Sequence, residues 1–75
     1  MNILEVFGSN LKKYREDKHI SQEKFAEISG LHRTYISDIE RFQRNVSLLN
    51  VQKIADAIGI DAYKLLMEDI KNGQK

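Results

Sequence analysis

Apolar residues recur along this chain at intervals of three and four, the spacing of helices that bury one face. The period-two alternation of a half-buried strand does not appear. Proline is absent and there are only four glycines, so little interrupts helix formation. The pattern therefore predicts an all-helical fold. We expect five helices, over residues 4–17, 21–29, 32–42, 47–58 and 61–70.

Polar residues and glycines mark the expected ends of these helices. Ser21, Ser47 and Asp61 stand where an N-cap must accept hydrogen bonds from free backbone N–H groups. Gly30 follows the second helix and permits a turn with positive φ. The first helix is expected to end beside His19, which must then adopt the left-handed conformation that glycine tolerates better.

The size of the chain limits what it can be. Seventy-five residues predict one small domain, residues 1–75, with no cysteine for disulfides and no Cys/His cluster for zinc. No run of 18 apolar residues predicts a membrane span, and polar residues near the N-terminus argue against a secretory signal. We therefore expect a cytoplasmic protein without a metal or cofactor. The net charge of +1 does not by itself indicate nucleic-acid binding, so only the placement of charges can.

The pair of short helices at 21–42 carries the functional signal. A tight turn at Gly30 joins the two helices, as in a helix-turn-helix. Ala26 is a small residue at the position where the later helix must pack closely against the earlier one. Four apolar side chains are expected to face inward: Phe25, Leu31, Ile36 and Ile39. The outer face of the later helix then carries Arg33, Thr34 and Ser37, at the end that reaches base edges in a major groove.

The motifs SQEKFA at 21–26, GL at 30–31 and ISDIER at 36–41 resemble the Cro/repressor type of helix-turn-helix. A narrower match, HRTYIS at 32–37, IER at 39–41 and RNVSL at 44–48, resembles the controller proteins of restriction–modification systems. The likeness covers about residues 8–67. It implies a five-helix, lambda-repressor-like domain that binds double-stranded DNA and catalyses nothing.

The resemblance also implies which residues touch DNA. Arg33 is expected to form a bidentate pair with guanine O6 and N7, with Thr34 and Tyr35 on bases or backbone beside it. Tyr35 has an equal alternative, a place in the core. Arg44 is expected to reach a base. Its alternative is an ion pair with Glu40, four residues earlier.

Three further polar residues are expected at the DNA backbone: Gln22, Ser37 and Asn45. Arg15 and Glu40 occupy the positions of a partly buried structural ion pair in this family. The sequence departs from the family pattern at three positions. Histidine stands at 19 and phenylalanine at 42, where glycine is usual, and His32 replaces the usual Ser or Asp N-cap.

The fourth and fifth helices carry more apolar surface than one core requires. Leu48, Val51, Ala55 and Ile58 are expected to face inward, whereas Leu49 lies outside that stripe. The fifth helix adds Tyr63, Leu66, Met67 and Ile70. Surplus apolar area of this kind predicts a homodimer interface; the alternative is that these residues complete the monomer core. A two-fold dimer would present two recognition helices about 34 Å apart to a palindromic operator.

For a controller protein, the resemblance implies recruitment of RNA polymerase to its own promoter and to that of the endonuclease gene, with repression at higher concentration. The alternatives are a phage-type repressor, or an antitoxin-like regulator whose main partner is a protein. Antitoxins add a disordered tail, and only about five residues follow the last expected helix, which disfavours that alternative. An enzyme is disfavoured because neither histidine has a catalytic partner pattern and no phosphate-binding glycine loop is present.

Overall fold

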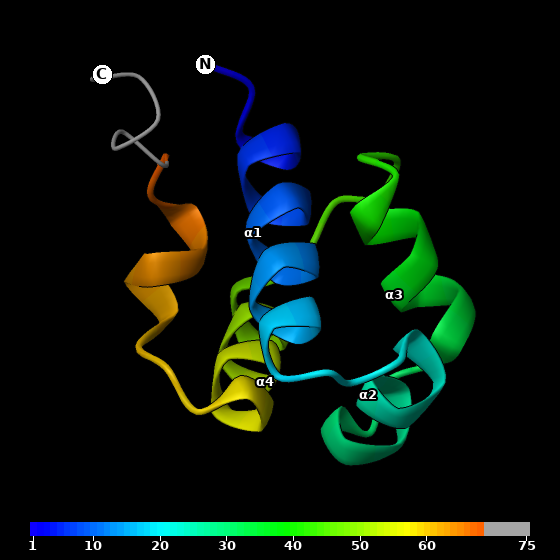
Figure 1. Ribbon diagram of the computed structural model, residues 1–75. Helices are drawn as coiled ribbons and strands as arrows, with labels where there is room; N and C mark the ends of the chain where they lie inside the picture. The colour runs from blue at the N-terminus through cyan, green and yellow to red at the C-terminus, as the bar shows by residue number, and fades with distance from the viewer. Residues whose placement is uncertain (69–75) are drawn as a thin grey trace.

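The longest helix, α1 (Ile3–Asp17), runs through the middle of the molecule and the other elements pack around it (Figure 1). The computed structural model describes residues 1–68. The remaining elements are α2 (Gln22–Ser29), α3 (Arg33–Glu40), α4 (Leu48–Ile58) and the 3₁₀-helix η1 (Ala62–Leu66). No strand occurs in this part of the chain. The prediction of an all-helical fold is confirmed.

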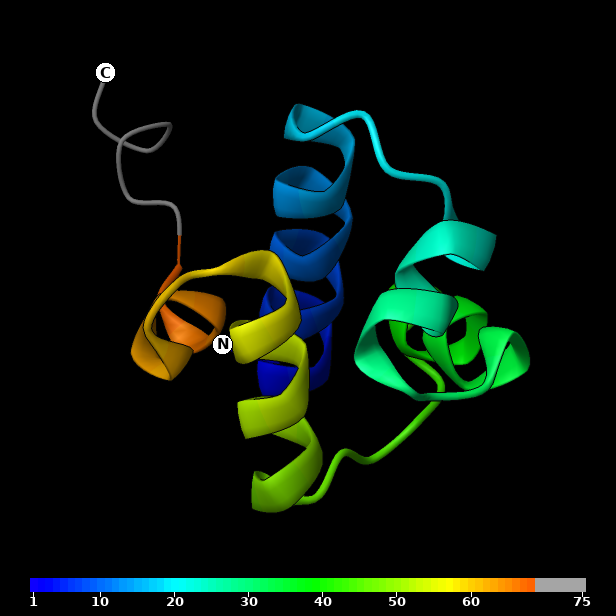
Figure 2. The ribbon, with the colours of Figure 1, turned by 90° about the horizontal axis from the view of Figure 1, so that it is seen from below.

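Two groups of elements flank α1. The pair α2 and α3 lies on one side of it and η1 on the other, and both views show this arrangement (Figures 1 and 2). α4 contacts both α2 and η1, so it closes the end of the molecule between them. The core lies where these elements meet. Its fully buried side chains are Leu11, Phe25, Ile36, Ile39, Ile54 and Leu65.

Side-chain caps begin all four α-helices. Ser21 and Ser47 accept from the backbone N–H groups of Lys24 and Asn50, as predicted. His32 caps α3 through Nδ1, which accepts from the Thr34 N–H at 3.1 Å. Asp61 occupies the N-cap position of η1, but its side chain makes no capping hydrogen bond, contrary to expectation.

The ends of α1 and α3 are closed by non-glycine residues in the left-handed conformation. His19 has φ 58° and Phe42 has φ 66°, each just after a helix. The N–H of the residue following each of them bonds back to a carbonyl five residues earlier, Ile20 to Arg15 and Gln43 to Asp38. These are Schellman closures, which usually have glycine at the left-handed position. α3 therefore ends at Glu40, two residues before the predicted end.

α1 and α3 pack closely at Gly8. A Cβ at this position would collide with the Ile39 carbonyl oxygen and would lie 2.8 Å from Cδ1 of Phe42. The absence of a side chain therefore sets how near the two helices approach. This contact was not predicted.

The predicted fifth α-helix is wrong within the described residues, because η1 is a 3₁₀-helix of five residues. The amide of Asn10, buried on α1, donates to the carbonyls of Lys64, Leu65 and Met67 at 3.3, 2.9 and 2.8 Å. A continuing α-helix would pair such carbonyls with N–H groups four residues on. Since Asn10 takes them instead, the segment stays short. Ile70, predicted on this helix, lies outside the described residues.

Leu48 is wrongly predicted as an inward residue of α4. Its exposed fraction is 82%, whereas Val51, Ala55 and Ile58 are buried as expected, together with Ile54. Leu48 is the first residue of α4, one turn before Val51, and the helix has not yet reached the core there.

Candidate nucleic-acid interface

The outward face of α3 is set by the residues that α3 buries. Ile36 and Ile39 are buried against α1 and α2, which turns Arg33 and Thr34 to solvent in the first helical turn. The approach of α2 to α3 depends on Gly30, whose φ of 77° supplies the left-handed turn predicted between them. The first turn of α3 is thus free to enter a groove, as the outer helix of a helix-turn-helix must be.

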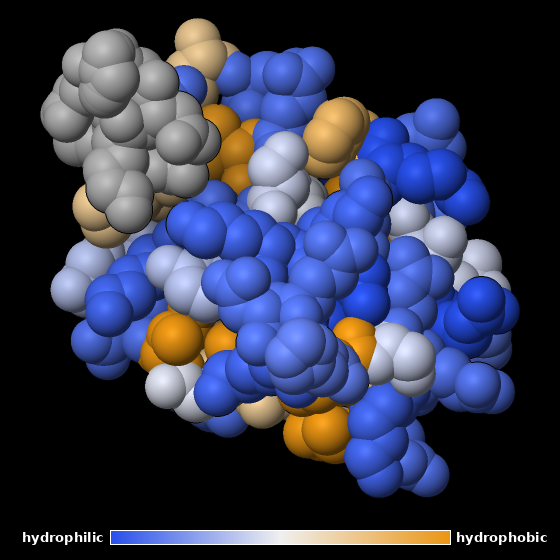
Figure 3. Space-filling view, viewed as in Figure 1, coloured by the Kyte–Doolittle hydropathy of each residue, from blue (hydrophilic) through white to orange (hydrophobic). Residues whose placement is uncertain are grey.

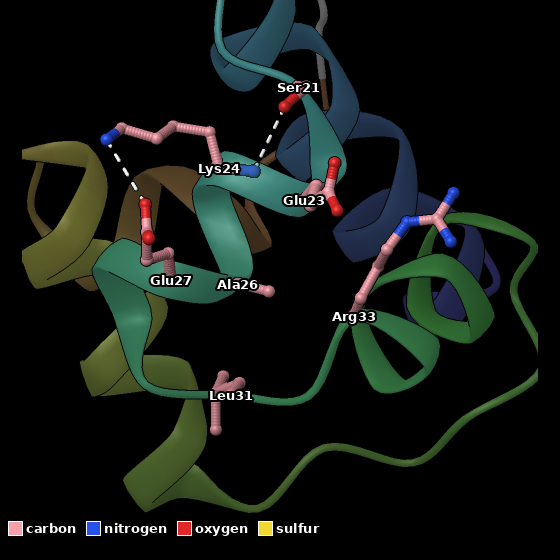
Figure 4. A pocket seen from close by; sticks show the side chains of 7 residues that line it. All are labelled: Ser21, Glu23, Lys24, Ala26, Glu27, Leu31 and Arg33. Atoms are coloured by element: carbon pink, nitrogen blue, oxygen red, sulfur yellow. Dashed lines mark hydrogen bonds and ion pairs between the residues drawn. The ribbon is translucent and has the colours of Figure 1, made fainter.

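Arg33 lies at the rim of a groove between α2 and the start of α3. The side chains that line it are Ser21, Glu23, Lys24, Ala26, Glu27, Leu31 and Arg33, around about 590 Å³ (Figure 4). Lys24 is bound to Glu27 at 3.2 Å, so its charge is locally balanced. For Arg33, no ion pair appears within the described residues.

Tyr35 packs against the edge of the core, the alternative that the sequence left open, and its contact with DNA stays a prediction. Its ring is partly buried against the core, while its hydroxyl accepts a hydrogen bond from Nδ2 of Asn50 at 3.0 Å. The guanidinium of Arg44 lies over the ring, 4.9 Å from its centroid. Such a contact contributes about 0.5–1 kcal/mol at exposed sites. It joins the loop after α3 to the helix.

Arg44 does not pair with Glu40. Its Nη1 lies 3.6 Å from Oδ2 of Asp38, whose other oxygen accepts from Nη2 of Arg41 at 2.5 Å. Arg41 also donates to Oγ of Ser37 at 3.1 Å. The pairing with Glu40 fails because that carboxylate is already occupied inside the domain.

Arg15 and Glu40 form a bidentate ion pair, with Nε and Nη2 of Arg15 at 2.7 and 2.8 Å from the two carboxylate oxygens. The side chains are only 9% and 4% exposed. The hydrogen bonds that Arg15 donates to the Glu40 carboxylate raise the pKa of Arg15, which therefore stays charged at any working pH. The Arg15 Nη1 donates to the Ile20 carbonyl, so the pair ties α1, the following turn and α3 together.

The structure places the three expected DNA-backbone residues differently from one another. Gln22 lies at the start of α2 and its Nε2 donates to Glu40 at 3.0 Å, which leaves the second amide proton of Nε2 for another acceptor. Ser37 is half-buried and engaged by Arg41. Asn45 is exposed in the loop and also lines an apolar pocket beside Val46 and the start of α1.

The surface over α1 and α3 is mainly hydrophilic in the view of Figure 3. Phe42, just after α3, is an exception and is 41% exposed. The four residues predicted for the dimer interface are all exposed: Leu49 by 65%, Tyr63 by 58%, Leu66 by 37% and Met67 by 50%. Leu48 and Ile3 add to the exposed apolar side chains. The face predicted for DNA and the residues predicted for the dimer are thus of opposite chemical character.

Sequence reasoning missed Asp38 and Arg41, which connect Ser37 to Arg44. It also missed Asn50, which donates a hydrogen bond to Tyr35. The spacing of Asp38 and Arg41, three residues apart on a helix, was a usable signal for their ion pair. No comparable signal exists for Asn50 and Tyr35, which are fifteen residues apart and meet only in the fold.

Other kinds of site are not found in residues 1–68. No group of three or more His, Cys, Asp or Glu side chains there is arranged to hold a metal ion. None of the helices in that range has both the length and the apolarity required to cross a bilayer.

Comparison with known proteins agrees with this geometry. Residues 11–65 match the helix-turn-helix family. The control protein C.SmaI of Serratia marcescens is 45% identical over 75 residues, which cover 99% of this chain and 89% of that protein. The control protein C.BamHI of Bacillus amyloliquefaciens is 52% identical over 66 residues, 87% of this chain and 82% of that one.

A solved structure of a controller protein is also similar to this chain. The restriction-modification controller protein C.AhdI of Aeromonas hydrophila aligns with a TM-score of 0.80 at 47% identity, covering 83% of this chain and 94% of its own. The resemblance to the Cro/repressor type and to controller proteins is confirmed. The chain therefore belongs to the helix-turn-helix family, a family of DNA-binding regulators and not of enzymes.

Proposed function

We propose that this chain is the controller protein of a restriction–modification system, a transcriptional regulator that reads a palindromic operator with α3. The observation that carries the proposal is the pair of faces on α3. Ile36 and Ile39 anchor one face in the core, while the other presents Arg33 and Thr34 to solvent. The similarity to control proteins over nearly the whole chain supports the controller role in particular.

At the operator, each residue has a distinct role in this proposal. Arg33 pairs with guanine O6 and N7 in the major groove, and Thr34 contacts the neighbouring base or its backbone. Arg44 and Tyr35 act together on a base at the edge of the site, since the guanidinium already lies on the ring. Gln22, Ser37 and Asn45 hold phosphates, which position the helix without reading sequence.

The proposed active form is a two-fold dimer. Leu49 on α4, together with Tyr63, Leu66 and Met67 at η1, supplies the exposed apolar surface for it. Two copies of α3 about one DNA turn apart, roughly 34 Å, require a palindromic site. Bound there in the cytoplasm, the dimer recruits RNA polymerase to its own promoter and that of the endonuclease gene. A second dimer then represses both.

The test is footprinting of the purified protein on the DNA upstream of its own gene. The proposal predicts protection of a palindromic segment, with an affinity for it at least about 10³-fold tighter than for random duplex at the same salt concentration. Uniform, sequence-independent protection would contradict it. A protein that bound only as a complex with another protein would instead indicate the antitoxin-like alternative.

A further inference from the structure

Asp38 is the hub of the polar surface at the end of α3. Its Oδ1 accepts from Arg41 at 2.5 Å and its Oδ2 lies 3.6 Å from Nη1 of Arg44. Arg41 in turn holds Ser37, and Arg44 covers the ring of Tyr35. Three residues assigned to DNA contact are therefore connected to a single carboxylate.

The Asp38 carboxylate lies among side chains that, in the proposed function, face the negatively charged DNA. The Asp38 side chain is 21% exposed, against 59% and 50% for Arg41 and Arg44. One negative charge thus lies beneath two guanidinium groups, which point outward above it. Its presence opposes the attraction of phosphates to this surface, yet it fixes the direction of both arginines.

We propose that Asp38 is a specificity-determining residue that holds Arg41 and Arg44 for base edges and penalises their capture by phosphates. The inference rests on the proposed function, because it presumes that this surface meets DNA. Asp38 acts through the two arginines and is a positioning residue.

The physical reason is the difference between the two kinds of acceptor. A phosphate that draws one arginine away leaves the Asp38 carboxylate with one counter-ion instead of two beside the charged duplex, which costs free energy. Guanine O6 and N7 carry no net charge. Because a guanidinium has five N–H donors, Arg44 or Arg41 can bind a base while keeping its contact with Asp38. Binding to the operator therefore retains the pairing that binding to random DNA loses.

The experiment compares Asp38→Asn with wild type on operator and on random duplex, over a range of salt concentrations. Freed arginines add about one phosphate contact per subunit on random DNA. The slope of log Kobs against log[salt] should then steepen by about 0.9 per subunit, and affinity for random duplex should rise about eightfold per subunit near 0.1 M salt. Operator affinity should change less than about twofold, so the ratio of the two affinities falls.

The matched control is Asp61→Asn, which removes the same charge from an exposed side chain without a capping hydrogen bond. Asp61 lies in the turn between α4 and η1, on the other side of the molecule from α3 (Figures 1 and 2). The Asp61→Asn variant should have the same salt dependence of binding and the same ratio of operator to random-duplex affinity as wild type. A merely structural role for Asp38 would weaken both kinds of binding and would lower thermal stability in parallel.

Three results would overturn the inference: an unchanged affinity ratio in Asp38→Asn, the same change in Asp61→Asn, or loss of operator affinity without a gain on random DNA. Failure of the proposed function would be seen separately. In that case wild type itself would show no preference for the operator, whatever the variants do.

Discussion

Buried polar groups in this domain have partners that only the fold could bring together. Within residues 1–68, no buried side-chain nitrogen or oxygen lacks a hydrogen bond. Arg15 and Glu40 are the charged example, 25 residues apart and joined in a bidentate pair that is almost wholly removed from water. A charge buried in this way is stable only while its partner remains.

Arg15→Ala should lower the free energy of unfolding by about 3–5 kcal/mol, because the Glu40 carboxylate would stay buried without its counter-ion. Urea unfolding followed by circular dichroism measures the change. The double variant Arg15→Met with Glu40→Leu removes both charges and should recover most of the loss. Lys24→Ala, which breaks an exposed ion pair, should cost less than about 1 kcal/mol. Equal losses for Arg15→Ala and Lys24→Ala would contradict the assignment.

For single residues, the sequence predicts backbone conformation and exposure where these depend on the residue's own helix or turn. Gly30 and His19 have the positive φ expected where a helix must end. The outward position of Arg33 and Thr34 follows from the apolar spacing of α3. The partner of Arg44 could not be predicted, because the choice between Glu40 and Asp38 depends on Glu40 being held by Arg15 from another helix.

The contact between α1 and α3 leaves no room for a larger residue at Gly8. Gly8 leaves the Ile39 carbonyl and the Phe42 ring in the space where a side chain would stand. α3 also shares the Arg15–Glu40 pair with α1, so its position relative to the rest of the domain is set at two points. The orientation of α3, the proposed recognition helix, thus depends on residues that are buried between the helices.

Gly8→Ala should destabilise the domain by about 1–3 kcal/mol, through the overpacking at the crossing of α1 and α3. This is opposite in sign to the usual gain of about 1 kcal/mol when glycine in a helix is replaced by alanine. Ser9→Ala, at the next and exposed position of α1, is the control and should be neutral or slightly stabilising. Thermal unfolding of the two variants measures the difference, and a more stable Gly8→Ala would show that the crossing is looser than described.

The elements that the sequence predicted best are those with caps and a buried stripe of their own, α1 to α4. The last one was wrong in type, because its helical appearance came from apolar spacing alone. Its geometry is instead decided by the Asn10 amide, more than fifty residues away in the chain. Spacing carries no information about such a contact.

The molecule as a whole separates two surfaces by chemistry. Hydrophilic side chains cover most of the α1 and α3 face (Figure 3). Large exposed apolar groups come from Leu49 on α4 and from Tyr63 and Met67 at η1. With a net charge of only +1, one subunit attracts a duplex weakly. In the proposed dimer, two subunits would double the phosphate contacts, so dimerisation and DNA binding should be coupled.

Leu49→Glu should raise the dimer dissociation constant at least about 30-fold, since a charge would be buried at the subunit contact without a partner. Because Leu49 is 65% exposed, the fold of each subunit should be unaffected. Sedimentation equilibrium gives the dissociation constant. Ile28→Glu, on α2, places the same charge on another exposed apolar residue and should leave it unchanged. A Leu49→Glu variant that dimerised like wild type would exclude Leu49 from the interface.

The most direct test of base reading by α3 is the affinity of wild type and Arg33→Ala for the operator and for operators altered one base pair at a time. Wild type should lose about 1–3 kcal/mol when the guanine read by Arg33 is replaced, and Arg33→Ala should lose that discrimination at this position while keeping it elsewhere. If wild type and Arg33→Ala bound the matched and altered sites with the same relative affinities, α3 would not be the element that reads the sequence.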